Sequence, residues 1–249
     1  MNVNAETPLG FGHFIAQSDA VGKTLLAVLI AMSVLSWAII ALKGLTLVAR
    51  KRRSATFLNF FWNATSLEAV AHEIATHGAR DPFSHLASHA MQAQSHHARY
   101  GAGKLGEAGN ASDFVTRTIK KVLDEETTRL ENGLAVLATV GATAPFVGLF
   151  GTVWGVYHAL VAIGMSGAGT LDKVAGPVGE ALIMTGLGLA VAIPAVVGYN
   201  ALTRANRVVL SRLDAFAYEV HTFVAMGQPL ATADAPSPTV RVLTPRTAG

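Results

Sequence analysis

Glu180 is the residue of this 249-residue sequence that points most clearly to chemistry. It is the only formally charged side chain among the thirty residues between Lys173 and Arg204. A carboxylate inside a membrane span is costly and usually faces a protein interior or a water-filled path. A buried carboxyl group can accept a proton near neutral pH, so Glu180 is a candidate proton acceptor. The alternative is a position near the outer end of the span, seven residues after Lys173, where it meets water.

Two threonines accompany this carboxylate, each on a helix face that is otherwise made of small residues. Helical spacing aligns one set on an earlier segment and one on a later segment: Gly141, Gly148, Thr152 and Gly155, then Ala181, Thr185, Gly188, Ala192 and Ala195. Small faces let helix backbones approach closely where lipid gives no hydrophobic drive. We therefore expect these faces to pack tightly. A sharper hypothesis is that they surround a central space, to which the threonines supply hydroxyl groups.

Nine histidines invite a metal hypothesis, but their spacing does not support one. His72 and His77 are one residue too far apart for the zinc-protease motif, in which the two histidines are four positions apart. His85 and His89 share helical spacing without a further ligand pattern. No nucleophile, base and orienting group stand in a recognised arrangement. We expect neither an enzyme nor a metal or cofactor site, and the role of the histidine-rich segment 72–97 stays open.

The composition indicates a membrane protein. Only 14% of the residues are charged, against about 25% in soluble domains, and the mean hydropathy is +0.41. Segments 24–42 and 132–171 carry no formal charge, and 174–203 carries only Glu180. A membrane-spanning helix needs about 20 mostly apolar residues, so the sequence predicts three spans. The first apolar run is longer than that of a typical signal peptide, and we expect it to be retained. Cysteine is absent, which excludes disulfides.

The basic residues predict the orientation, because short loops rich in Lys and Arg stay in the cytoplasm. Segment 43–131 is rich in both, and Arg204, Arg207 and Arg212 follow the last span. Residues 1–22 contain none. Three spans with the N-terminus outside satisfy both basic regions. Splitting the long apolar stretch into two spans near Pro145 is the competing interpretation, and it would place one basic region outside. The basic run at 50–53 then flanks a span, and we expect no nucleic-acid binding.

The expected organisation is all-helical, with long cytoplasmic helical extensions of the spans. The segments are a periplasmic arm (1–20), transmembrane helix 1 (21–44), a cytoplasmic helical region (45–132), transmembrane helix 2 (133–162), a periplasmic loop (163–177), transmembrane helix 3 (178–203), a cytoplasmic helical extension (204–226) and a disordered tail (227–249). Within the first cytoplasmic region, we predict polar helices over 55–77 and 84–99.

Two further predictions concern the cytoplasmic helices. Asn110 or Ser112 is a candidate cap for a helix that begins near Asp113, and nothing in the sequence is expected to stop that helix before the second span. The other helix follows the third span and carries one apolar stripe of helical spacing: Leu202, Val209, Leu213, Phe216, Val220 and Phe223. This stripe must pack against another helix, most simply in an oligomer.

Three motifs in the spans closely resemble the MotA/TolQ/ExbB proton channel family. They are APFVGLFGTVWG at 144–155, VAGPVGEAL at 174–182 and AIPAVVGYN at 192–200. The family's polar lining residues fall on Thr152, Thr185 and Glu180, and all three residue types match. The resemblance leans towards the ExbB branch. The four-span MotA branch fits poorly.

The resemblance to the ExbB branch implies a ring-like homo-oligomer, a pentamer, in the bacterial inner membrane. The ring would enclose transmembrane helices of an ExbD-like partner, with a TonB-like partner alongside. Proton flow would then energise the import of iron–siderophores and vitamin B12 across the outer membrane. The alternatives are a TolQ-like subunit of the Tol-Pal envelope system and a non-conducting membrane scaffold.

Overall fold

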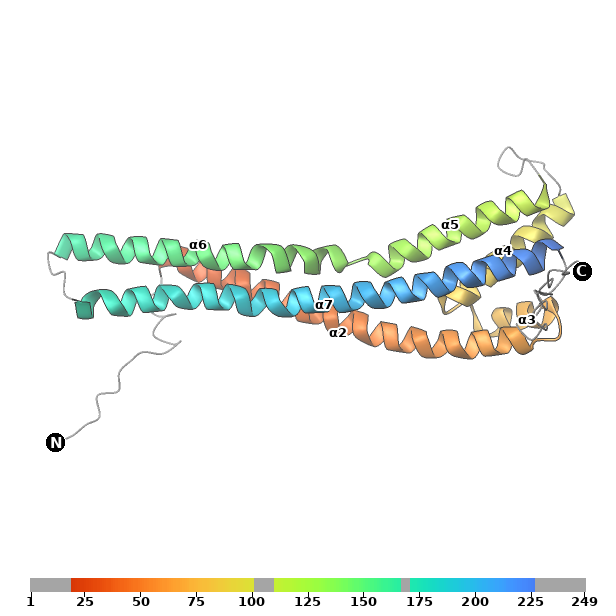
Figure 1. Cartoon of the computed structure of the whole chain (residues 1–249), viewed down its shortest axis with the longest axis horizontal. Helices are drawn as coiled ribbons and strands as arrows, with labels where there is room; N and C mark the ends of the chain where they lie inside the picture. The colour runs from red at the N-terminus through yellow and green to blue at the C-terminus, as the bar shows by residue number, and fades with distance from the viewer. Residues whose placement is uncertain (1–18, 101–109, 167–170, 227–249) are drawn as a thin grey trace, which may run out of the picture. The chain divides into compact units, whose positions relative to one another are not determined.

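The computed structural model describes residues 19–100, 110–166 and 171–226, and these residues are helical with no strand among them. Their helices are α2 (Ala20–Asn63), α3 (Leu67–His77), α4 (Pro82–Tyr100), α5 (Ala111–Glu131), α6 (Leu134–Ser166) and α7 (Leu171–Met226), shown in Figure 1. Three helical stretches, in α2, in α5–α6 and in α7, are long and apolar enough to cross a membrane. The all-helical class and the three spans predicted from the sequence are confirmed. Most of the predicted arm, all of the predicted tail and part of the loop at 163–177 lie outside the described residues.

The chain divides into two compact units, and each has its own apolar core. Unit 1 comprises residues 1–52 and 127–209, and unit 2 comprises residues 53–126 and 210–249. Helix α6 belongs wholly to unit 1, whereas α3 and α4 belong wholly to unit 2.

The core of unit 1 is built by α2, α6 and α7. Leu29 of α2, Leu137 of α6 and Met184 of α7 are at most 2% exposed and belong to one apolar cluster. Ser36 lies within α2 and is also buried, and its hydroxyl donates to the carbonyl of Met32. A buried hydroxyl needs such a partner, and the carbonyl one turn earlier in the same helix supplies it.

The helix that begins at Ala111 stops before α6, contrary to the prediction of one long helix into the membrane. Helix α5 ends at Glu131, residues 132–133 form a turn, and α6 begins at Leu134. Gly133 has φ +80°, a left-handed conformation that glycine adopts at little cost. A single glycine is tolerated inside helices, so its presence in the sequence did not reveal that the backbone changes direction here.

Side chains from two other helices satisfy the carbonyls at the end of α5. The Lys43 ammonium of α2 donates to the carbonyl oxygens of Arg129, at 3.2 Å, and Leu130, at 3.1 Å. The Asn206 amide of α7 donates to the same Leu130 oxygen at 2.8 Å, and Asn206 is 7% exposed. The last carbonyls of a helix lack partners within it, and a cation there also interacts favourably with the helix dipole. We call these contacts the α5 junction.

The predicted start of α5 is confirmed. The side-chain oxygen of Asn110 accepts a hydrogen bond of 2.8 Å from the backbone N–H of Asp113, as an N-cap residue does. The apolar side chains Val115, Ile119 and Val122 then follow helical spacing and are buried in the core of unit 2. Local chemistry and periodicity were sufficient for this element.

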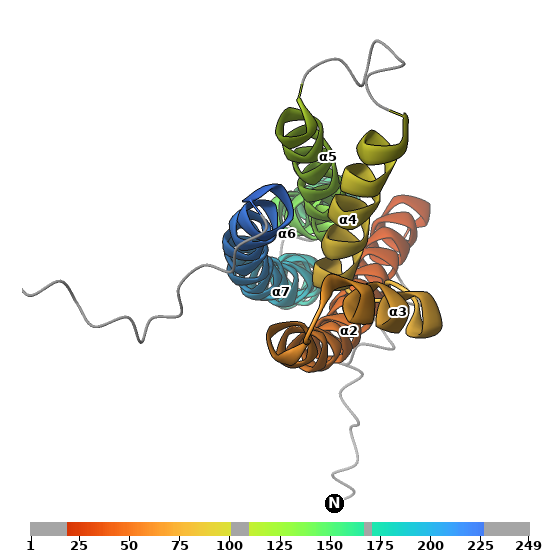
Figure 2. The ribbon, with the colours of Figure 1, turned by 90° about the vertical axis from the view of Figure 1, so that its right-hand side faces the viewer.

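The core of unit 2 contains side chains from α2, α3, α4, α5 and α7, helices that Figure 2 shows in end view. Phe216 of α7 lies at its centre, with ring-centroid distances of 5.0 Å to Phe61, 5.5 Å to Phe83 and 6.4 Å to Phe57. These edge-to-face contacts add to the burial of apolar area. Most of the predicted stripe on α7 is therefore buried against helices of the same chain, and an oligomer is not needed to cover it.

The predicted helix over 55–77 is two helices. Residues 55–63 complete α2, and α3 begins at Leu67. Ser66 is the N-cap residue of α3, because its hydroxyl oxygen accepts a hydrogen bond of 3.2 Å from the N–H of Ala69. A new helix therefore starts here. The second predicted helix, over 84–99, corresponds to α4.

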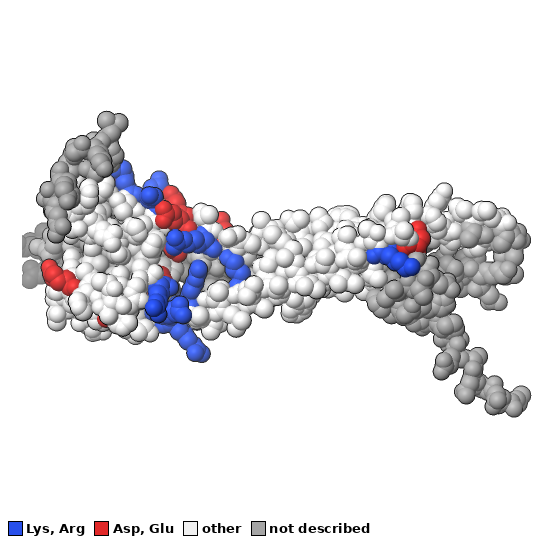
Figure 3. Space-filling model, turned by 180° about the vertical axis from the view of Figure 1, so that it is seen from behind, with Lys and Arg blue, Asp and Glu red and all other residues white. Residues whose placement is uncertain are grey.

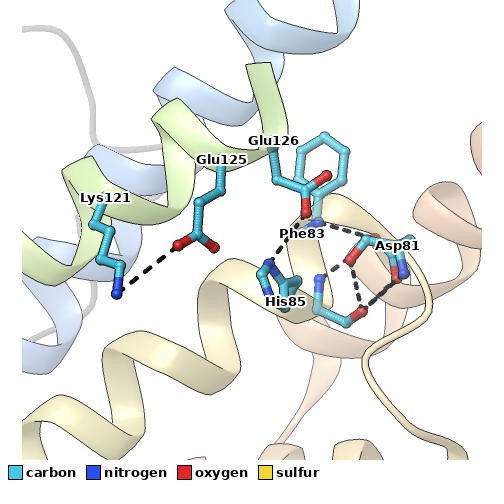
Figure 4. A network of polar contacts seen from close by, with 7 residues as sticks. Asp81, Phe83, His85, Lys121, Glu125 and Glu126 are labelled. Carbon is cyan, nitrogen blue, oxygen red and sulfur yellow. Dashed lines mark hydrogen bonds and ion pairs between the residues drawn. The ribbon is translucent and has the colours of Figure 1, made fainter. Parts of the chain in front are cut away.

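Asp81 is a buried carboxylate at the start of α4 (Figure 4). Its Oδ1 accepts from the N–H of Phe83, at 3.0 Å, and its Oδ2 accepts from the Ser84 hydroxyl, at 2.7 Å. The Ser54 hydroxyl of α2 donates to Oδ1 at 3.3 Å. One turn along α4, the His85 ring lies 3.2 Å from the Glu126 carboxylate of α5, within ion-pair distance. Polar contacts thus tie α4 to its neighbours around an otherwise apolar core.

Candidate functional site

Helix α6 is continuous through Pro145 over 33 residues, which excludes the interpretation that split this stretch into two spans. Proline removes one backbone donor from a helix, and membrane helices tolerate it where neighbouring helices satisfy the freed groups. Ala144, the preceding residue, is fully buried against α7. The proline therefore lies within a packed span and not in a turn.

Helices α6 and α7 are in close backbone contact at Gly148 and Gly188. A Cβ atom built on Gly148 would lie 2.5 Å from the carbonyl oxygen of Met184, and one on Gly188 would lie 2.7 Å from that of Ala144. Real Cβ atoms do not approach oxygen so closely, so neither glycine can be replaced without movement of the helices. We call this contact the glycine crossing, and Figure 1 shows the two helices side by side.

The other small residues of the two faces extend this contact along the helices. A Cβ on Gly155 would lie 3.0 Å from the Cβ of Ala181, and one on Gly141 would lie 2.5 Å from Val196. Ala192 is 5% exposed and belongs to the apolar cluster of unit 1. Small side chains therefore line the α6–α7 contact on both sides of the glycine crossing.

Thr152 and Thr185 meet one turn away from the glycine crossing. Their Oγ1 atoms lie 2.5 Å apart, within one hydrogen bond, and both residues are half-buried. Thr152 Oγ1 also lies 3.2 Å from the carbonyl oxygens of Gly148 and Ala181. The close approach of the backbones brings the hydroxyls together, because a larger residue at either glycine would separate the helices.

The threonine pair can form a directed chain of hydrogen bonds. A threonine hydroxyl has one donor hydrogen and two acceptor lone pairs. When Thr152 donates to a carbonyl oxygen, Thr185 donates to Thr152, and lone pairs of both hydroxyls remain available. Such a pair can hydrogen-bond a water molecule or a carboxylic acid, but it cannot carry a permanent charge. The pair suits a positioning or relay role beside a titrating group.

Glu180 lies on α7, one residue before the Ala181 whose carbonyl oxygen approaches Thr152. Its side chain lies outside the described part of the structure, and of the three predicted lining residues only Thr152 and Thr185 are seen in contact. The role of the carboxylate remains a prediction.

A polar cluster on α2 and α6 was not predicted from the sequence. Oδ2 of Asp19, just before α2, accepts a hydrogen bond of 2.7 Å from the indole nitrogen of Trp154, two residues after Thr152. Oδ1 accepts another from the backbone N–H of Gly22, at 2.7 Å. The His158 ring lies against Trp154 in a tilted arrangement, with the ring centroids 4.6 Å apart. Asp19 is 135 positions from Trp154 in the sequence, and local sequence patterns do not predict a contact between residues so far apart.

The hydrogen bond from Trp154 is the largest influence on Asp19, and with the one from Gly22 it lowers the pKa of this carboxyl below the ordinary value of 3.8. The positive charge of a protonated His158 acts in the same direction. Asp19 is therefore an anion at neutral pH, just before the N-terminus of α2, where the helix dipole favours negative charge.

The outward faces of α6 and α7 are apolar and exposed. Phe146 is 70% exposed, Val153 60%, Ile193 61% and Val197 62%. The surface view from behind in Figure 3 shows a broad uncharged stretch, with most of the visible Lys and Arg gathered beyond one of its ends. Exposed apolar surface of this extent indicates contact with lipid or with another subunit. Among the described residues, no group of three or more His, Cys, Asp or Glu side chains is arranged to hold a metal ion.

Comparison with known proteins identifies the family of these helices. The model of the MotA/TolQ/ExbB proton channel family matches residues 79–215, more than half of the chain. The chain is 42% identical to the biopolymer transport protein ExbB of Xanthomonas campestris pv. campestris, over 90% of this chain and 91% of that protein.

Other relatives carry the names of two branches of the family. Identity is 37% to the biopolymer transport protein ExbB of Neisseria meningitidis, over 78% of this chain and 87% of that one. Identity is 32% to the Tol-Pal system protein TolQ of Pseudomonas aeruginosa, over 88% of this chain and 94% of that protein. Together with the matched spans that contain the glycine crossing and the threonine pair, these similarities show that the chain belongs to the MotA/TolQ/ExbB proton channel family.

Proposed function

We propose that this chain is an ExbB-like subunit of an inner-membrane motor that uses proton flow to energise transport across the outer membrane. The observation that carries the proposal is the threonine pair between α6 and α7, within the segment that matches the proton channel family. The higher identity to relatives named ExbB than to those named TolQ favours biopolymer transport over the Tol-Pal system.

The proposed pathway is lined by Thr152, Thr185 and Glu180. The two hydroxyls would hold water or the carboxyl group of an ExbD-like partner helix, and Glu180 would tune the electric field or exchange a proton. One elementary charge that crosses 100 mV releases about 2.3 kcal/mol. A few protons can therefore break several helix contacts of modest strength. On this view the chain is the housing of the motor, and the main titrating group lies on the partner.

The remaining parts of the proposal come from the resemblance to the ExbB branch. They are a pentameric ring, a TonB-like partner, import of iron–siderophores and vitamin B12, and a periplasmic N-terminus with a cytoplasmic C-terminus. The basic segments at 43–131 and 204–212 support this orientation. The membrane boundaries 21–44, 133–162 and 178–203 belong to the same proposal.

Growth on an iron–siderophore tests the proposal in a strain that lacks ExbB and TolQ but keeps ExbD and TonB. The strain would carry the wild type, Thr152→Val, Thr152→Ser or Glu180→Gln, at equal membrane levels. Valine preserves the volume of threonine without the hydroxyl, and serine keeps the hydroxyl. We expect rescue by the wild type and the serine variant and loss of rescue with valine and with Glu180→Gln.

Thr143→Val is the matched control. Thr143 is exposed on the same helix and donates only to the carbonyl of Thr139, so its replacement should leave growth unchanged. Full rescue by Thr152→Val and Glu180→Gln would favour the non-conducting scaffold. Failure of the wild type to support growth on the siderophore, together with restored resistance of the same strain to detergent, would favour the TolQ-like alternative.

A further inference from the structure

A cavity of about 200 Å³ opens on the surface of unit 1 where α2, the end of α5 and α7 meet. Its wall is mostly apolar and includes Leu42, Leu47 and Leu202. Two cationic side chains, Lys43 and Arg50, lie on the same wall. The volume is below that of a typical site for a whole drug-sized ligand, so the cavity suits a fragment of a larger amphipathic molecule.

The position of the cavity along α2 corresponds to the edge of a membrane. It begins at Leu42, the last residue of the charge-free stretch 24–42, and reaches Arg50 at the start of the basic run. Leu45 and Val48 lie between these points and are 70% and 55% exposed, so apolar side chains still point outward beyond Lys43. Arg50 is therefore expected at the depth of the lipid headgroups, with apolar wall on the membrane side of it.

These two cations have no carboxylate partner within the described part of the chain. Among residues 19–100, 110–166 and 171–226, neither Lys43 nor Arg50 forms an ion pair. Lys43 uses two of its three N–H groups on the carbonyls of the α5 junction, which leaves one for another acceptor. Arg50 presents a planar fork that matches the oxygens of a phosphate group. An apolar cavity with two such cations at its rim is complementary to an anionic amphiphile.

We propose that this cavity binds an anionic phospholipid, with its phosphate between Arg50 and Lys43 and the start of one acyl chain against Leu42, Leu47 and Leu202. Basic pockets between transmembrane helices select anionic headgroups by this chemistry. The site involves neither the threonine pair nor Glu180, and it is independent of the proposed proton pathway. A lipid here would also cover the Lys43 side of the α5 junction.

Native mass spectrometry of the full-length protein in detergent tests the proposal by titration with two lipids. Phosphatidylglycerol is the anionic probe, and phosphatidylcholine with the same acyl chains is the zwitterionic control. One basic side chain at a lipid surface contributes about fivefold in affinity. We expect tighter binding of phosphatidylglycerol than of phosphatidylcholine, and Arg50→Gln should lower the affinity for phosphatidylglycerol about fivefold.

Arg53→Gln is the matched control, because Arg53 is exposed and does not line the cavity. It should change the affinity less than twofold. Leu47→Trp fills the cavity and should abolish binding of either lipid. An unchanged thermal unfolding midpoint would show that this variant is folded. The comparison of Arg50→Gln with Arg53→Gln does not depend on the Leu47 variant. Equal binding of the two lipids would overturn the proposal, and so would an equal loss with Arg53→Gln. Complete competition by an equal concentration of glycerol 1-phosphate would show that the site binds a free anion, and it would overturn the proposal of a lipid site.

Discussion

The indole nitrogen of Trp154 donates a hydrogen bond of 2.7 Å to the carboxylate of Asp19, and so joins the start of α2 to α6. The two residues lie 135 positions apart. Because Trp154 follows Thr152 by two residues, this bond holds the part of α6 that carries the threonine pair.

The Asp19–Trp154 contact should open in acid. Trp154 first, and Gly22 next, lower the pKa of Asp19 below 3.8, so the stabilisation is fully present above 3.8 and is lost as the pH falls through the lower folded value. We expect the fluorescence of Trp154 to shift in that range in a Trp37→Phe/Trp62→Phe background. Asp19→Asn keeps an acceptor but does not titrate, and its trace should be flat. The same transition in both proteins would assign it to another group.

Gly188→Ala should destabilise the protein by about 1–3 kcal/mol, because the new methyl group meets the carbonyl oxygen of Ala144 at 2.7 Å. The thermal unfolding midpoint of the detergent-solubilised protein measures the effect. Gly186→Ala is the control on the same helix, since a Cβ there has no atom within 4 Å. It should be neutral or stabilising by up to about 1 kcal/mol, because alanine favours a helix. Equal losses in both variants would remove the special role of the glycine crossing.

The losses of stability caused by Asn206→Ala and Lys43→Met should be more than additive when the two substitutions are combined. Both side chains donate to the carbonyl oxygen of Leu130, so either single variant leaves one donor in place and costs about 1 kcal/mol. The double variant leaves that carbonyl without a side-chain donor and should cost about 1–3 kcal/mol beyond the sum. Chemical denaturation in detergent provides the double-mutant cycle, and Asn200→Ala, exposed on α7, is the control. Strict additivity would mean that the two donors do not share an acceptor.

Phe216→Ala should destabilise unit 2 by about 3–5 kcal/mol, because the ring is 3% exposed and contacts Phe61 and Phe83. Tyr218→Ala, at a position 69% exposed on the same helix, should change stability by less than about 0.5 kcal/mol. Hydrogen exchange of unit 2 measures both. The loss should not depend on protein concentration, because the stripe is buried within one chain. A loss that vanishes at high concentration would place the stripe between copies.

Local signals in the sequence predicted much of the fold. Long apolar stretches with at most one charged residue indicated the three spans, since a membrane-spanning helix needs about 20 mostly apolar residues. Asn110 marked the start of α5 through its own side chain, which bonds within the next three residues. In both cases the cause and its consequence lie within one segment of the chain.

Predictions that needed a distant partner were incomplete or wrong. The periodicity of α7 predicts the apolar stripe and its burial against another helix, but it favours an oligomer as the cover, because periodicity shows which face is apolar and not what lies against it. The turn at Gly133 was missed, since the donors to the Leu130 carbonyl just before it, Lys43 and Asn206, come from other helices. The small faces with Thr152 and Thr185 were visible in the sequence, but only coordinates show that the two hydroxyls bond to each other.

The α5 junction also constrains the order of events during synthesis. The two donors that meet at the Leu130 carbonyl oxygen lie 87 residues before it and 76 residues after it in the sequence. When the ribosome has released the first two spans, the Leu130 carbonyl can be reached by Lys43 alone. The second donor arrives only after most of α7 has been made. The hydrogen bond from Lys43 can therefore form before α7 exists, whereas the bond from Asn206 to the same oxygen must form later.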